Sequence, residues 1–130
     1  MEAKEFIGLD VGQKHTGLAR ASSAAKIAKP LKSLPTAKVI DELRQIIQKN
    51  DVEAVIIGLP RNLNGDDTAQ TKWVREWVEK SRAQIPAPLF WADEALTSNN
   101  NGGSDDEHAA AAAAILQDFL DTPDGERLEA

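Results

Sequence analysis

An apolar run in the middle of the chain is the feature that most constrains its fold. Residues 52–59 read VEAVIIGL, and β-branched and other apolar residues dominate the run. Such a run is typical of a central strand that is buried on both faces of a sheet. Apolar residues recur at helical spacing on either side of it, over about residues 36–50 and 67–83. The sequence therefore predicts an α/β fold in which helices pack on both faces of a mixed sheet.

The remaining segments complete the element order βββαβαβα. Three short strands precede the first helix, and Ser22-Ser23 form the turn between the second and the third. Pro30 places the third strand at an edge of the sheet or at a bulge, and Pro60 is expected to end the central strand. With the central strand, the sheet is expected to have five strands. The other four strands and the last helix are expected over residues 5–11, 16–21, 25–33, 89–92 and 105–120.

Length and composition narrow the class of protein. A chain of 130 residues fits a single domain over residues 1–130. Within it, residues 98–104 read as a shortened flexible loop and residues 122–130 as a frayed tail. The chain has no cysteine, which excludes disulfides and thiolate chemistry and fits the cytoplasm. An apolar run of about 18 residues and a secretory signal are both missing, so we expect no membrane association.

Charge is distributed unevenly along the chain. The net charge is −6, which argues against indiscriminate binding of nucleic acid. Residues 1–40, however, carry seven Lys or Arg against three Asp or Glu, a local balance of +4. The N-terminal part is therefore a candidate anion-facing surface, although a solvated lysine-rich hairpin with no partner would look the same.

Acidic residues mark three places that this fold can bring together. The first strand ends at Asp10, and the last expected strand runs into LFWADE and ends at Glu94. Asp105 and Asp106 stand in the first turn of the last helix. Neighbouring strands that run in the same direction would gather these acids at one edge of the sheet. Each acid also has a structural interpretation. Asp10 can open a turn, and the acids of the helix start fit a capping arrangement and the helix dipole.

Clustered carboxylates call for a cation, because their mutual repulsion would force one of them to hold a proton. Carboxylate and water oxygens are the ligands that Mg²⁺ and Mn²⁺ prefer. Only His15 and His108 could supply nitrogen ligands, so we do not expect a zinc site. Asp93 stands next to Glu94 on a strand and should point to the opposite face, which leaves it a structural role.

Four stretches of the chain resemble, in order, the signature regions of the YqgF/RuvX family. They read FIGLDVGQKHTGLA, VIIGLPRNLNGDDTAQ, FWADEALTS and DDEHAAAAAAILQDFLD. Members of this family are small bacterial proteins described as Holliday-junction resolvases or pre-16S rRNA nucleases, with a ribonuclease H-like fold. The similarity covers nearly the whole chain. The stretch from Gly58 to Gly65, with the two flanking motifs, makes it specific.

The resemblance implies a site and an activity. It implies a metal-dependent nuclease that acts on structured RNA or on branched DNA, such as the 5′ end of pre-16S rRNA or a Holliday-like junction. Two Mg²⁺ or Mn²⁺ ions would serve this reaction, and the protein would act as a monomer or a homodimer. The implied catalytic and metal-binding residues are Asp10, Glu94 and Asp106, with Asp105 as the other candidate for the third acid. The implied nucleic-acid contacts are Gly12, Lys14, Gly17, Arg61 and Asn62.

Three features differ from the family pattern. Ala95 stands where an arginine usually follows the DE pair, and NNNGGS replaces a longer, often basic segment. Asp106 lies nine residues before Ile115, whereas a spacing of about seven is expected. These differences favour, as the alternative, a catalytically weak or inactive protein that binds nucleic acid or the ribosome. An ATP-dependent phosphotransferase, which shares the DxGxKxTG pattern, needs a second lobe for which 130 residues leave no room.

Overall fold

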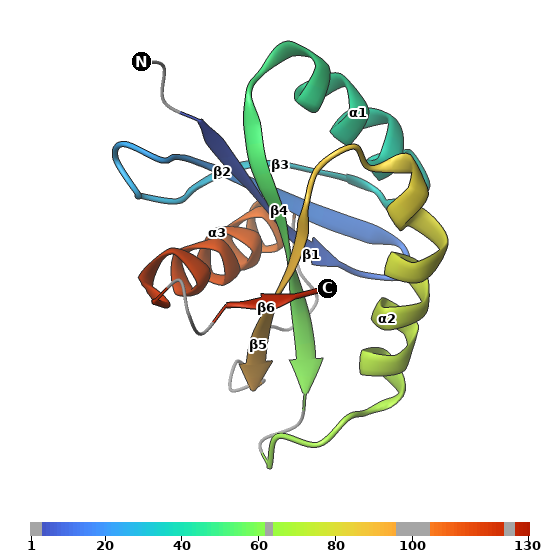
Figure 1. Ribbon diagram of the computed structural model, residues 1–130. Coiled ribbons are helices and arrows are strands. Elements are labelled where there is room, and N and C mark those ends of the chain that lie inside the picture. The colour runs from blue at the N-terminus through green and yellow to red at the C-terminus, as the bar shows by residue number, and fades with distance from the viewer. Residues whose placement is uncertain (1–3, 62–63, 96–104, 124–126) are drawn as a thin grey trace.

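The fold is built around one mixed sheet of six strands in the part of the chain that the structure describes (Figure 1). The computed structural model describes residues 4–61, 64–95, 105–123 and 127–130. Strands β1 to β3 form an antiparallel meander, β4 and β5 run parallel to β1, and β6 is antiparallel to β5. Across the sheet the order is β3 (Lys29–Pro35), β2 (His15–Ser22), β1 (Glu5–Val11), β4 (Val52–Arg61), β5 (Leu89–Ala95) and β6 (Leu128–Glu129).

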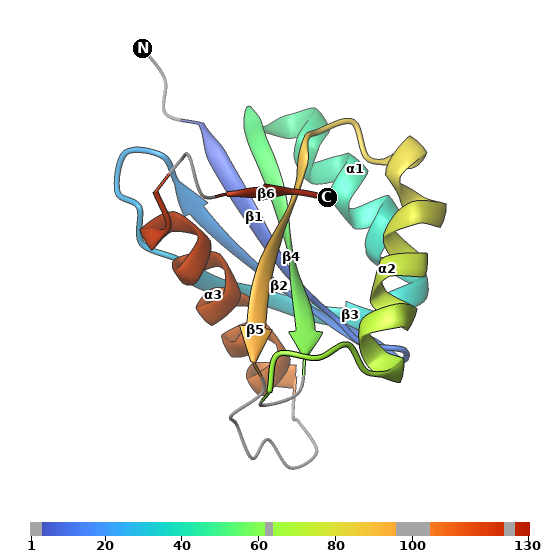
Figure 2. The same cartoon turned by 60° about the horizontal axis from the view of Figure 1, so that its bottom comes forward.

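Helices cover both faces of the sheet, as predicted. Helices α1 (Val39–Lys49) and α2 (Ala69–Ser81) lie on one face, and α3 (Asp105–Asp121) lies on the other (Figure 2). Two short 3-10 turns, η1 (Thr36–Lys38) and η2 (Arg82–Gln84), precede α1 and follow α2. None of the helices in the described ranges is long and apolar enough to cross a membrane.

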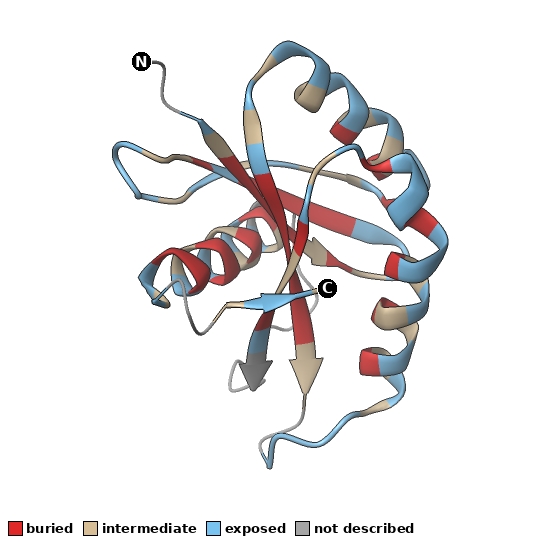
Figure 3. Ribbon diagram, viewed as in Figure 1, coloured by how far each residue is buried: buried red, intermediate tan, exposed pale blue. Residues whose placement is uncertain are grey.

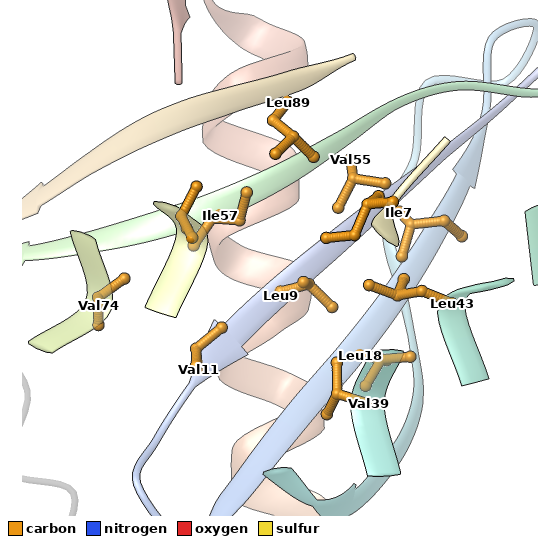
Figure 4. Close-up of a cluster of buried hydrophobic side chains, with 12 residues drawn as sticks. Ile7, Leu9, Val11, Leu18, Val39, Leu43, Val55, Ile57, Val74 and Leu89 are labelled. Carbon is orange, nitrogen blue, oxygen red and sulfur yellow. The ribbon is translucent and has the colours of Figure 1, made fainter. Parts of the chain in front are cut away.

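The strand alternation of β4 divides the core into two layers. Val55 and Ile57 pack toward α1 and α2, whereas Ala54 and Ile56 pack toward α3. All four side chains are at most 2% exposed, which confirms that this strand is buried on both faces (Figure 3). Figure 4 shows the first layer, in which side chains of β1, β2 and β4 meet those of α1 and α2.

Small residues let α3 lie very close to the sheet. A Cβ atom built on Gly8 of β1 would come 2.7 Å from Cβ of Leu116. On Gly17 of β2 it would overlap the carbonyl oxygen of His108. On the helix side, Ala109 and Ala112 are buried against the strands. The small side chains of both elements allow this close approach, and only glycine fits beneath the start of the helix.

Two predictions about the strands were wrong. Strand β4 continues through Pro60 to Arg61, because its pairing with β5 continues while its pairing with β1 has already ended at Ile57. A proline is tolerated there, since β4 has lost one neighbour. The expected count of five strands is also too low. In the segment expected to be frayed, Leu128 and Glu129 pair with Trp91 and Phe90. The loop predicted over residues 98–104 lies outside the described residues.

Candidate active site

The carboxylate of Asp10 faces the start of α3. Asp10 lies near the end of β1 and pairs directly with Gly17 of β2. Residues paired in this way project to the same face of an antiparallel sheet, and at Gly17 that face is covered by His108 of α3. Burial raises the pKa of Asp10 above its ordinary value, and the electrostatic influence of His108 lowers it in part.

His108 is the residue of the helix start that the structure brings to Asp10. Its ring stacks on that of His15, with 6.0 Å between ring centroids and 20° between planes. Its position is seven residues before Ile115, the spacing expected for the third acid. The sequence assigns His108 no role because two histidines do not make a zinc site, and this spacing is the signal that points to it. The side chains of Asp105 and Asp106 lie outside the described part of the structure.

The turn between β1 and β2 is held in place by η1. The amide of Gly12 donates to the carbonyl of His15 (3.0 Å), and the hydroxyl of Thr36 donates to the carbonyl of Gly12 (2.6 Å). The buried hydroxyls of Thr16 and Thr36 lie 2.8 Å apart, and the amide of Thr36 donates to the carbonyl of Lys14 (2.9 Å). Lys14 is exposed at the tip of this turn. The backbone of Lys14 is therefore held in the turn that follows β1, and its side chain is exposed.

The backbone of Glu94 lies at the same end of the sheet as Asp10. The parallel register pairs Leu9 with Ile57, and the next residue of β4, Gly58, pairs with Ala92 of β5. Glu94 follows two residues later, opposite Pro60. Strands β1 and β5, which carry Asp10 and Glu94, thus end on the same side of the molecule, as predicted (Figure 2). The side chain of Glu94 is outside the described residues, so its predicted role as a ligand stays a prediction.

Arg61 belongs to a different cluster of charges, on the α2 side of the sheet. Its Nε lies 3.5 Å from Oδ1 of Asp67 and 3.4 Å from Oδ1 of Asp93, and its Nη1 donates to the carbonyl of Gly65 (3.3 Å). Arg75 of α2 lies 3.5 Å from the second oxygen of Asp67. The ion pair of Asp93 agrees with the structural role expected for that residue. The structure therefore does not bring Arg61 together with Asp10, and Asn62 lies outside the described residues.

The donor chemistry at Asp10 fits a divalent cation. No group in the described ranges donates a hydrogen bond to this partly buried carboxylate, and a buried charge is costly when it has no partner. In the same ranges, no three acidic or histidine side chains lie close enough together to hold an ion by themselves. An ion at Asp10 would therefore need further oxygen ligands, such as water, substrate phosphate or the carboxylates proposed below.

A family model matches residues 4–122, and its description is RuvX, Holliday junction resolvase. The chain belongs to the RuvX family. Among its relatives, a protein of Fusobacterium nucleatum is 34% identical over 84 residues, which are 63% of this chain and 61% of that protein. A protein of a Roseiflexus species is 31% identical over 100 residues, 75% of this chain and 71% of its own. Both carry the name "Putative pre-16S rRNA nuclease".

A solved structure shares the fold of this RuvX protein. It is described as Thermus thermophilus RuvC in complex with a Holliday junction substrate. The two chains superpose with a TM-score of 0.65 and 15% identity, covering 98% of this chain and 99% of the other. At this identity the likeness establishes the fold, which is the ribonuclease H-like α/β architecture expected from the sequence.

Proposed function

We propose that this RuvX protein is a metal-dependent nuclease that hydrolyses phosphodiester bonds in structured nucleic acid. The names of its family and of its relatives support this class of reaction. Precursor 16S rRNA is the substrate we favour, because the relatives are named for it, and its 5′ end is the part that the resemblance implies. A branched DNA junction is the other candidate. Both substrates place the protein in the cytoplasm. We expect it to be a single domain that acts as a monomer or a homodimer.

The observation that carries the proposal is the carboxylate of Asp10. It is partly buried at the carboxyl end of a strand, where open α/β sheets bind their ligands. It lacks a hydrogen-bond donor among the described groups, which leaves its oxygens available to a cation. A purely structural aspartate at the end of a strand would be expected to cap the following turn. Here that turn is held instead by Thr36.

The proposed roles follow from these positions. Asp10, Glu94 and one of Asp105 and Asp106 would hold Mg²⁺ or Mn²⁺. Two such ions supply an activated water and stabilise the leaving oxygen. Lys14 would contact a phosphate of the substrate, and the backbone at Gly12 and Gly17 would allow close approach. Arg61 and Asn62 would contact nucleic acid further from the scissile bond, and Arg61 would have to exchange its carboxylate partners for phosphate.

The experiment is a cleavage assay with matched aspartate variants. Labelled precursor rRNA fragments and a four-way DNA junction are incubated with the wild type, Asp10→Asn and Asp93→Asn, with Mg²⁺, with Mn²⁺ or with chelator. We expect Asp10→Asn to lower the cleavage rate by about 10³-fold, since a metal ligand contributes several kcal/mol. Asp93→Asn should keep the rate within about threefold, because its exposed ion pair contributes little.

Two results would contradict the proposal. Cleavage that survives in Asp10→Asn would mean that the activity comes from another site or from a contaminant. Tight binding without cleavage of either substrate by the wild type would favour the alternative, a nucleic-acid-binding or ribosome-binding protein. The differences at Ala95 and residues 98–104 favour that alternative.

A further inference from the structure

We propose that His108 and Asp10 form a mixed imidazole–carboxylate site that takes a first-row transition-metal ion, such as Co²⁺ or Zn²⁺, in preference to Mg²⁺, contrary to the expectation from the sequence that zinc has no site. The catalytic role of such an ion rests on the proposed nuclease function, whereas the binding of the ion can be measured without any substrate. The mixed site adds His108 to the ligands that α3 supplies, beside the carboxylate proposed above.

The packing of α3 brings the two side chains to the same place. Asp10 and Gly17 are direct partners across β1 and β2, and a Cβ on Gly17 would overlap the carbonyl of His108. The first turn of α3 therefore rests on the strand pair that carries Asp10. The imidazole of His108 acts electrostatically on the Asp10 carboxylate, while no hydrogen bond joins them in the described structure. Such a pair leaves its donor atoms available for an ion.

The ring of His15 stacks beside that of His108. The two rings are nearly parallel, with 6.0 Å between their centroids. His15 stands on the same strand and the same face as Gly17, two residues away, and the β1–β2 turn before it is held by Thr36. A side chain that is oriented in this way loses less rotamer freedom when it binds a ligand.

The chemistry of the two donors then decides which ion is preferred. A neutral imidazole nitrogen is a good ligand for Co²⁺ and Zn²⁺, whereas Mg²⁺ is held by oxygen and keeps several of its waters. At this site Mg²⁺ would gain only the Asp10 carboxylate among the described donors. A transition ion would gain both groups, and water or substrate phosphate would complete its coordination.

Ion binding is tested by calorimetric titration of the metal-free protein at pH 7.5 with Co²⁺, Zn²⁺, Mn²⁺ and Mg²⁺. We expect the wild type to bind Co²⁺ and Zn²⁺ at least about 100-fold more tightly than Mg²⁺. His108→Ala should weaken Co²⁺ and Zn²⁺ by about 10- to 100-fold and leave Mg²⁺ within threefold. His108→Asp should instead favour Mg²⁺, which shows that the loss in His108→Ala does not come from misfolding.

His15→Phe is the matched control, since it keeps a flat ring beside His108 and removes the second imidazole. It should keep the Co²⁺ affinity within about threefold. A loss equal to that of His108→Ala would overturn the assignment by making His15 the imidazole ligand. Because the chain has only two histidines, nitrogen-15 imidazole shifts resolve each ring. Adding Zn²⁺ should move the nitrogen signals of His108.

The outcomes separate this inference from the proposed function. If His108→Ala binds Co²⁺ and Zn²⁺ as the wild type does, or the His108 signals stay still, the mixed site is wrong. Cleavage lost in Asp10→Asn would in that case still support the nuclease. If His108-dependent metal binding is found without cleavage of either nucleic acid, the mixed site stands and the proposed function fails.

Discussion

Two groups of charged residues lie at the same end of the sheet, on opposite faces, and they differ in how their charges are satisfied. On the α2 face, Arg61 has Asp67, Asp93 and the carbonyl of Gly65 around it. On the α3 face, Asp10 is partly buried and no described group donates a hydrogen bond to it. Burying a charge without a partner costs free energy. At Asp10 this cost appears as a raised pKa, whereas the charge of Arg61 has two carboxylates within 3.5 Å, although its buried Nε makes no hydrogen bond to any described group.

The contrast shows which of two sequence motifs is prepared to bind a ligand. Both Asp10 and Arg61 belong to motifs that resemble the family, which implies a metal ligand at Asp10 and a nucleic-acid contact at Arg61. In the structure, a ligand at Asp10 would supply a missing partner, whereas a phosphate at Arg61 would have to replace carboxylates already in place. The following predictions test this difference.

The largest effect is expected for Asp10→Asn, and it has opposite signs for activity and stability. Cleavage should fall by about 10³-fold, while the metal-free variant should be more stable than the wild type at neutral pH. The reason is that asparagine keeps the shape of the side chain without the cost of a buried charge. Urea unfolding at pH 7.5 with chelator measures the second effect. A variant less stable than the wild type would contradict our description of Asp10.

The stability that Asp10→Asn gains over the wild type should depend on pH, because the pKa of Asp10 is raised in the folded protein. A carboxyl group with a higher pKa in the folded state binds its proton more tightly there than in the unfolded chain. The protonated Asp10 contributes most to the stability of the wild type below the pKa that this group has in the unfolded chain. The contribution falls as the pH rises to the pKa of the group in the folded protein, and it is constant at higher pH. The advantage of Asp10→Asn should therefore grow over that interval and then level off. Equal differences at all pH values would contradict the shift.

The next largest effect is expected for Gly17→Ala. The added methyl group would overlap the backbone of His108, so α3 must move away from Asp10. We expect a loss of about 3 kcal/mol in the free energy of unfolding, measured by urea denaturation. Gly65→Ala is the control. Apart from its chain neighbours, no described atom lies within 4 Å of a Cβ built there, and the φ of 80° costs about 1–2 kcal/mol in strain for alanine. A smaller loss at position 17 than at position 65 would contradict the close contact.

Thr36→Val should have an intermediate effect on stability. The substitution removes the hydroxyl that donates to Gly12 and leaves the buried hydroxyl of Thr16 without its partner. We expect a loss of about 1–3 kcal/mol. Thr122→Val, which loses one exposed hydrogen bond to the carbonyl of Asp118, should cost about 0.5 kcal/mol. Equal losses in the two variants would show that the β1–β2 turn does not depend on η1.

The smallest effect is expected in the Arg61 cluster. A double-mutant cycle with Arg61→Ala and Asp93→Asn should give a coupling energy of about 0.5–1 kcal/mol that shrinks in high salt. The side chains are 26% and 46% exposed, so water screens the pair. A coupling above about 2 kcal/mol would show that this cluster is as critical to the fold as the Asp10 side, and the comparison would fail.

The order of the main elements followed from periodicity, because each buried face left its pattern in the sequence. The run at residues 52–59 and the helical spacing around it predicted β4, α1 and α2. Strand β6 could not be predicted in this way, since it is two residues long and both residues are exposed. Its position depends on contacts with β5 that no local pattern encodes. The same is true of the two residues by which β4 extends to Arg61.

The candidate site was predicted in part. The pairing of strands placed Asp10 and the backbone of Glu94 at one edge, as the order of elements had indicated. His108 was missed because its role depends on how α3 lies across β1 and β2, which is set by the glycines beneath it. The ion pairs of Arg61 were also missed. They join β4, α2 and the end of β5, and a sequence motif does not contain that information.

The contact of α3 with the first three strands has a consequence for the order of folding. The helix docks on β1, β2 and β3 through residues far apart in the chain, and Gln117 bonds to the amide of Ala28 across 89 positions. Contacts of such long separation form slowly, because the entropy of closing the loop opposes them. The meander and the β1–β4 pair can form while the chain is still being synthesised. We therefore expect the surroundings of Asp10 to assemble late, when α3 closes onto a sheet that already exists.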